Sequence, residues 1–180
     1  MKNITIKQYL KLSIRERVIY DALLISLKSS EVMKINLEII SWDDVKKINK
    51  MLGKVDSFNV VCEIFQLAFK INEEDFYNLP IVNYFQIKKY LIEKFVYLHN
   101  NEVKLLSSSS SDVGLWQIAG GNRLDFYSEN LPLSQLAKIY GGYPFDYGKK
   151  PYNEILYLLK MNQTQNEVEN KFNELKSKQP

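Results

Sequence analysis

The sequence predicts a mainly α-helical protein with minor β structure. Apolar residues recur at helical spacing along most of the chain, whereas an alternation of period two appears clearly in one short segment. Only seven of the 180 residues are glycine and five are proline, so we expect long uninterrupted elements. Apolar residues make up 46% of the sequence and charged residues 25%, which is enough for a hydrophobic core.

The expected helices of the N-terminal half follow from capping residues and apolar periodicity. Thr5, Ser13 and Ser41 each precede a periodic segment, and their side-chain oxygens can accept backbone N–H groups at a helix start. Acidic residues follow two of the predicted starts, where the helix dipole favours them. These signals predict helices over residues 6–12, 14–28, 42–53, 57–69 and 81–99, with a short turn-like element over 72–80.

Two segments have the composition of β-strands. Residues 33–39 alternate apolar and polar side chains, which is typical of a half-buried strand. Residues 103–106 give a weaker indication of the same kind. The expected β content is therefore small.

The serine run at 107–111 is the clearest internal boundary. It predicts a helical N-terminal domain over residues 1–106, a Ser-rich linker or loop over 107–114, and a smaller helical region over 115–180. In this last region we expect a short helix ending at Tyr140, an aromatic loop, and a long terminal helix that begins near Pro151.

Composition excludes several classes of protein. One cysteine and one histidine exclude a disulfide framework and an ordinary zinc site. The net charge is +3, and Lys149 and Lys150 form only a small basic patch, which disfavours a nucleic-acid partner. We also expect no signal peptide and no membrane span.

No motif predicts catalysis. Cys62 and His99 are far apart in sequence and are interpreted as structural residues. Asp43-Asp44 and Glu73-Glu74-Asp75 are explained by helix-start electrostatics, and Gly120-Gly121-Asn122 by turn geometry. We therefore expect a non-enzymatic protein with no catalytic, cofactor-binding or metal-binding residues.

Aromatic residues concentrate between positions 140 and 157. Tyrosine supplies a large contact area at low entropic cost and is enriched in protein interfaces, although some of these rings can instead pack on their own domain. An amphipathic pattern continues in the terminal helix. The candidate partner-binding residues are Tyr140, Tyr143, Phe145, Tyr147, Tyr152, Tyr157, Val168, Phe172 and Leu175.

The C-terminal third resembles proteins of tailed bacteriophages. The resemblance covers residues 115–160 and rests on three stretches, the first being Trp116-Gln117-Ile118-Ala119-Gly120-Gly121-Asn122-Arg123-Leu124. The other two are Leu133-Ser134-Gln135-Leu136-Ala137-Lys138-Ile139-Tyr140-Gly141 and, after Pro144, Tyr152-Asn153-Glu154-Ile155-Leu156. A helix ending in Tyr-Gly, a proline-containing turn and an apolar helix are similar to features of phage tail assembly chaperones and related head–tail structural proteins.

The resemblance implies a virion structural protein of the tail or the head–tail junction that acts through protein–protein association. Its implied partners are other phage structural proteins and further copies of the chain, as a homo-oligomer or a ring subunit. Its implied location is the host cytoplasm during assembly and then the virion. A tail assembly chaperone, or a DNA-binding regulator that uses the C-terminal helices, are the alternatives.

Overall fold

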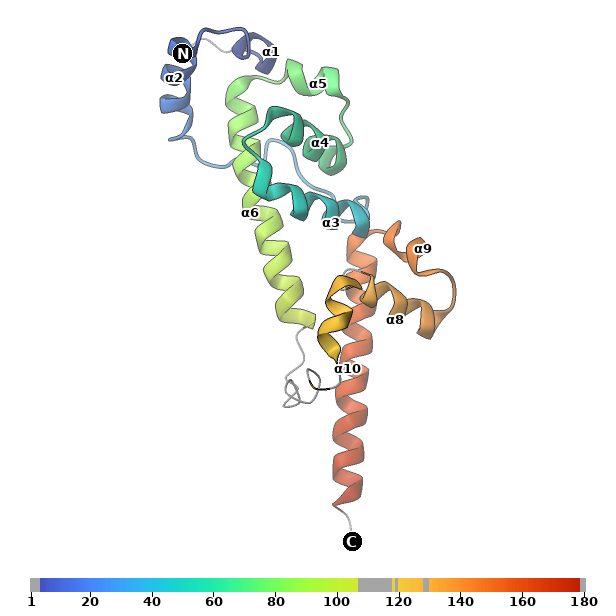
Figure 1. The fold of residues 1–180 in the computed structure, drawn as a ribbon. Coiled ribbons are helices and arrows are strands. Elements are labelled where there is room, and N and C mark those ends of the chain that lie inside the picture. Colours follow the sequence, from blue (N-terminus) through green and yellow to red (C-terminus); the bar gives the residue numbers. More distant parts are fainter. Residues whose placement is uncertain (1–3, 107–117, 119, 128–129, 179–180) are drawn as a thin grey trace. The chain divides into compact units, whose positions relative to one another are not determined.

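The computed structural model describes residues 4–106, 118, 120–127 and 130–178 and is shown in Figure 1. The chain forms two compact units, and neither is a continuous stretch of sequence. Unit 1 contains Met1–Asn36 and Asp44–His99, whereas unit 2 contains Leu37–Asp43 and Asn100–Pro180. The predicted linker over 107–114 lies outside the described residues.

The prediction of a mainly α-helical fold is confirmed. The N-terminal helices are α1 (Ile6–Tyr9), α2 (Ile14–Leu24), α3 (Trp42–Met51), the 3₁₀ helix η1 (Leu52–Lys54), α4 (Phe58–Phe69), α5 (Glu73–Asn78) and α6 (Ile81–Leu106). They are followed by the 3₁₀ helix η2 (Gly121–Tyr127), α8 (Leu131–Tyr140), α9 (Pro144–Gly148) and α10 (Tyr152–Ser177). No helix in the described part of the chain is long and apolar enough to cross a membrane.

The predicted helix starts at Thr5 and Ser13 are confirmed by their hydrogen bonds. Each side chain accepts the backbone N–H of the third helical residue, and the side chain of that residue accepts the N–H of the cap. These reciprocal capping boxes satisfy two donors that would otherwise lack partners. Both helices end earlier than expected, at Tyr9 and Leu24.

A cluster of aromatic rings forms the core of unit 1. Phe65 of α4 contacts Phe76 of α5 edge-to-face, with ring centroids 5.2 Å apart, and both rings contact Tyr84 of α6. Phe58 stacks on Tyr84, with ring centroids 4.8 Å apart. The cluster therefore joins α4, α5 and α6 through side chains that are almost entirely buried at Phe65, Phe76 and Tyr84.

The core of unit 2 joins three segments that are distant in sequence. Trp42 and Tyr152 are both buried and stack with centroids 5.4 Å apart. The Tyr152 hydroxyl donates to Oε2 of the buried Glu102, at the end of α6, over 3.2 Å. Burial is the main cause that raises the pKa of Tyr152, and the nearby Glu102 raises it further. The phenol therefore keeps its proton, and with it the hydrogen bond, at neutral pH.

The strand expected over residues 33–39 is wrong. The segment is irregular and then forms a turn, and the alternation of exposed and covered side chains ends at Ile39, which is exposed, while Ile40 is buried. No neighbouring strand is available in the described chain. Instead, the carbonyls of Leu37 and Ile40 accept the N–H groups of Asn153 and Tyr152, at the start of α10.

The weaker strand prediction over 103–106 is also wrong, because α6 continues through Leu106. Burial of Glu102 against Tyr152 stabilises this last part of the helix. The β pairings of the described residues are two isolated bridges, between Thr5 and Pro80 and between Ser41 and Pro151.

Candidate protein–protein interface

The predicted aromatic loop contains the short helix α9, which packs beside α8, the helix predicted to end at Tyr140, so that the two form a compact helical hairpin (Figure 1). Gly141 ends α8, and both it and Gly142 have positive φ, which a residue with a side chain rarely adopts. The buried Tyr147 closes the turn, because its hydroxyl donates to the carbonyl of Gly141 over 2.8 Å. The Lys150 ammonium lies 5.3 Å from the centre of the Tyr147 ring.

This closed turn directs three aromatic side chains into solvent. Tyr143 and Phe145 are 76% and 67% exposed, and Tyr140 is 45% exposed while its hydroxyl donates to Oδ1 of Asn162 over 2.8 Å. We call Tyr140, Tyr143 and Phe145 the aromatic surface. A fixed backbone beneath exposed rings lowers the entropy that binding a partner would cost.

The C-terminal end of the hairpin contacts the rest of unit 2. The carbonyl of Lys150 accepts the N–H of Trp42 over 3.0 Å. Gly148 lies directly against the carboxylate of Asp43, so closely that an added Cβ would overlap with the carboxylate. Asp43, the second residue of α3, therefore restricts which residue is allowed at the end of α9.

We expect Gly148→Ala to lower the free energy of unfolding of unit 2 by about 1–2 kcal/mol, because the new methyl group must displace the Asp43 side chain. Gly53→Ala is the matched control. Gly53 has open space around it, so this change should be neutral or stabilise the protein by up to about 1 kcal/mol. Urea unfolding followed by fluorescence measures both variants, and equal effects would contradict the prediction.

Two of the predicted partner-binding residues belong to the core. Tyr147 closes the hairpin, and Tyr152 stacks on Trp42. Neither presents its ring to a partner, because the packing within unit 2 already covers it. The residues of the predicted set that are exposed are Tyr140, Tyr143, Phe145, Tyr157, Val168, Phe172 and Leu175.

Exposed apolar residues form a row along one side of α10. This side contains Tyr157, Val168, Phe172 and Leu175. It also contains Met161, which lies between Tyr157 and Val168 and which the sequence analysis did not select. The spacing from Tyr157 to Met161 and from Val168 to Phe172 is four residues, which is the signal that could have identified Met161. We call these five residues the α10 stripe.

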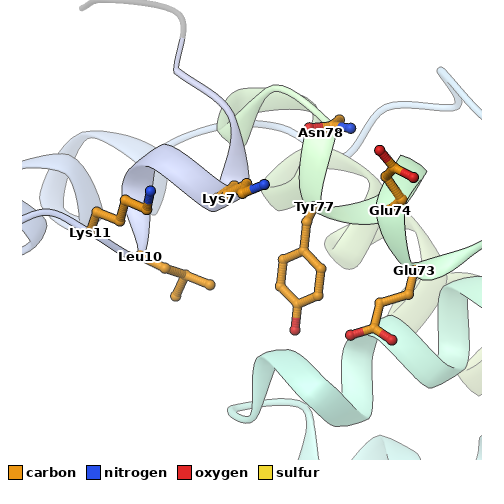
Figure 2. A pocket seen from close by; sticks show the side chains of 7 residues that line it. All are labelled: Lys7, Leu10, Lys11, Glu73, Glu74, Tyr77 and Asn78. Atoms are coloured by element: carbon orange, nitrogen blue, oxygen red, sulfur yellow. The ribbon is translucent and has the colours of Figure 1, made fainter.

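Unit 1 contains a groove of about 660 Å³ between α1 and α5, which Figure 2 shows. Lys7 of α1 and the two residues that follow the helix, Leu10 and Lys11, line one side, and Glu73 and Tyr77 are among the residues that line it from α5. Because cationic and anionic side chains both line the groove, its charge does not select a ligand of one sign. The sequence analysis did not predict this groove.

Cys62 and His99, the two residues considered for nucleophilic chemistry, both belong to unit 1 but differ in their exposure to solvent. Cys62 is buried in α4, and burial raises the pKa of its thiol, with a smaller contribution from Glu73. Since the thiolate is the reactive form, this environment makes Cys62 a poor nucleophile. His99 is exposed within α6, and does not end a helix as expected.

Across the described parts of the chain, no three His, Cys, Asp or Glu side chains are grouped so that they could hold a metal ion. Comparisons with protein family models, with curated proteins and with solved structures gave no match. The functional argument therefore depends on the surfaces described above.

Proposed function

We propose that this protein acts by associating with other proteins through the aromatic surface, without catalysing a reaction. The observation that carries the proposal is the exposure of Tyr143 and Phe145 on a turn closed by Tyr147. Single exposed apolar residues are ordinary on protein surfaces, but neighbouring exposed aromatic rings on a fixed backbone are characteristic of interface anchors.

The resemblance of residues 115–160 to tailed-bacteriophage proteins supports a narrower proposal. In it, the protein is a non-enzymatic structural subunit of the virion, at the tail or the head–tail junction, and the aromatic surface binds a neighbouring virion protein. A tail assembly chaperone would use the same surface only during assembly. A DNA-binding regulator would use α8 and α10 and would not require the aromatic surface.

The test compares virions that carry the unchanged chain with virions that carry Tyr143→Ser combined with Phe145→Ser. Quantitative peptide mass spectrometry on purified virions should find the unchanged chain at a fixed copy number. For the double variant, we expect incorporation to fall about tenfold or more, since losing two interface anchors typically costs more than 1 kcal/mol each. The far-ultraviolet circular dichroism should stay unchanged, because both side chains are exposed.

The matched control is Tyr97→Ser combined with Val96→Ser, which changes two exposed apolar residues of α6 in unit 1. Full incorporation of this control, with loss of the aromatic-surface variant, supports the proposal. Absence of the unchanged chain from virions excludes a structural subunit. Binding to duplex DNA that weakens steeply with salt would favour the regulator instead.

A further inference from the structure

The helix α10 has two apolar faces, one buried and one exposed. Tyr152, Ile155 and Leu159 are buried in unit 2, all within the first third of the helix. At 3.6 residues per turn, the α10 stripe projects about 170° away from these residues, so the stripe does not belong to the same core. Its members are between 40% and 68% exposed: Tyr157, Met161, Val168, Phe172 and Leu175.

The C-terminal part of α10 has little support from its own unit. From Thr164 to Lys178 every residue is exposed. Hydrogen bonds between side chains four residues apart, from Gln163 to Glu167 and from Gln165 to Glu169, support the helix locally. Single helices of this length are only marginally stable in water, and burial of an apolar stripe against another helix is the usual source of their stability.

Four of the five stripe residues occupy core positions in the heptad of a two-stranded coiled coil, and Phe172 occupies the flanking position e. With Met161 at heptad position a, Val168 and Leu175 also occupy a, and Tyr157, Thr164 and Lys171 occupy d. The small Thr164 leaves a hollow of about 620 Å³ on the stripe between Tyr157 and Val168. A hollow of this kind can receive a side chain from a second helix.

We propose that the α10 stripe binds the α10 stripe of a second copy of this chain in antiparallel orientation. In the register that covers the whole stripe, Tyr157 of one copy lies opposite Leu175 of the other, and Thr164 lies opposite Val168. This inference deepens the proposed function, since it rests on association through exposed apolar surfaces and names the partner of α10.

Charge selects the antiparallel orientation. Lys160 and Glu174 both occupy heptad position g, at opposite ends of the stripe. Antiparallel pairing brings g positions together, so each Lys160 meets a Glu174 of the other copy and two ion pairs form. Parallel pairing would instead place the two Lys171 ammonium groups against each other at d, where like charges are destabilising.

The same register places the two copies of Glu167 near each other on the two-fold axis. The repulsion between these two carboxylates opposes dimerisation. Removing it should therefore strengthen the dimer, whereas most substitutions in an interface weaken it. Glu167→Gln should make the dimer about two- to threefold tighter, as expected when one pair of exposed like charges is removed. A parallel dimer would not give this result, because Glu167 would then lie beside Phe172.

The experiment is sedimentation equilibrium of the full chain up to 0.5 mM. We expect a monomer–dimer equilibrium in which Val168→Asp weakens association about 100-fold, because a charge then lies at the centre of the apolar contact. Asn166→Asp is the matched control, since it adds the same charge on the opposite face of α10 and should leave the dissociation constant unchanged. Circular dichroism establishes that both variants remain helical.

The orientation is tested by exchanging charges. Lys160→Glu alone should weaken the dimer about tenfold, since two ion pairs become two repulsive pairs, and adding Glu174→Lys should restore the affinity. A chain that stays monomeric at 0.5 mM overturns the inference, as does equal weakening by Val168→Asp and Asn166→Asp. Failure of the charge exchange to restore affinity, or weakening by Glu167→Gln, overturns the proposed register.

These outcomes are separate from the test of the proposed function. The aromatic surface lies outside the α10 stripe, so Tyr143→Ser combined with Phe145→Ser should leave the dimer unchanged. A monomeric chain that still enters virions would overturn only the dimer. A dimeric chain that is absent from virions would overturn only the structural-subunit proposal.

Discussion

Tyr152→Ala should lower the free energy of unfolding of unit 2 by about 4–5 kcal/mol, at the upper end of the range for removing a large buried side chain. Tyr152 is fully buried, and its ring stacks on Trp42. The substitution leaves a cavity and also removes the phenol that donates to the buried Glu102. A buried carboxylate that loses a donor adds a desolvation cost to the loss of packing.

Two further substitutions separate the contributions to this effect. Tyr152→Phe keeps the ring and removes only the hydroxyl, so it should cost about 1–2 kcal/mol. Tyr157→Ala changes the same residue type on the exposed side of the same helix, and it should cost less than about 0.5 kcal/mol. Similar losses for Tyr152→Ala and Tyr157→Ala would contradict the assignment of Tyr152 to the core.

Urea unfolding followed by tryptophan fluorescence measures these differences. The chain has two tryptophans, so Trp116→Phe should be used as the background to make Trp42 the only fluorophore of this type. Because Trp42 stacks on Tyr152, its emission reports directly on the packing of unit 2.

Phe65→Ala should destabilise unit 1 by about 3–5 kcal/mol. Its ring is fully buried and contacts Phe69, Phe76 and Tyr84, so its removal disrupts the contacts of three helices. Phe65→Leu retains most of the apolar volume and should cost much less. Val96→Ala removes an exposed apolar side chain in the same unit and is the control.

Labelling of Cys62 with a thiol reagent measures the stability of unit 1. This residue is the only cysteine of the chain and is buried in α4, so a thiol reagent labels it only when the unit opens. The expected loss of stability corresponds to a labelling rate at least about 100-fold higher for Phe65→Ala, since each 1.4 kcal/mol is a factor of ten. An unchanged labelling rate would show that the aromatic cluster does not hold α4 in place.

The sequence predicts the helices well where a local signal exists. Capping residues such as Thr5 and Ser13 act through hydrogen bonds within three residues, so their effect is visible in the sequence. The strand prediction at residues 33–39 is wrong because the structure of this segment depends on a distant contact and not on a local signal. A strand requires a partner, and the partner of this segment is the start of α10, more than a hundred residues later.

The candidate interface could be predicted only in part. Tyrosine-rich composition correctly directed attention to residues 140–157, but it could not separate exposed from buried rings. Tyr152 and Tyr157 are on one helix whose two faces are both apolar, and nothing local determines which face the core covers. The decisive contact for Tyr152 is Trp42, which lies in a segment that the sequence analysis assigned to the N-terminal domain.

Unit 2 is made of two stretches that are separated in the sequence, and this has a consequence for synthesis on the ribosome. Residues 37–43 are translated early, but Trp42 acquires its stacking partner only when Tyr152 has emerged from the exit tunnel. At typical rates of chain elongation, the 110 residues from Asp43 to Tyr152 take about 5–20 s to add. During this interval Trp42 is an apolar side chain without its native neighbour, so a nascent chain paused before α10 should present a binding site for chaperones that the finished protein has closed.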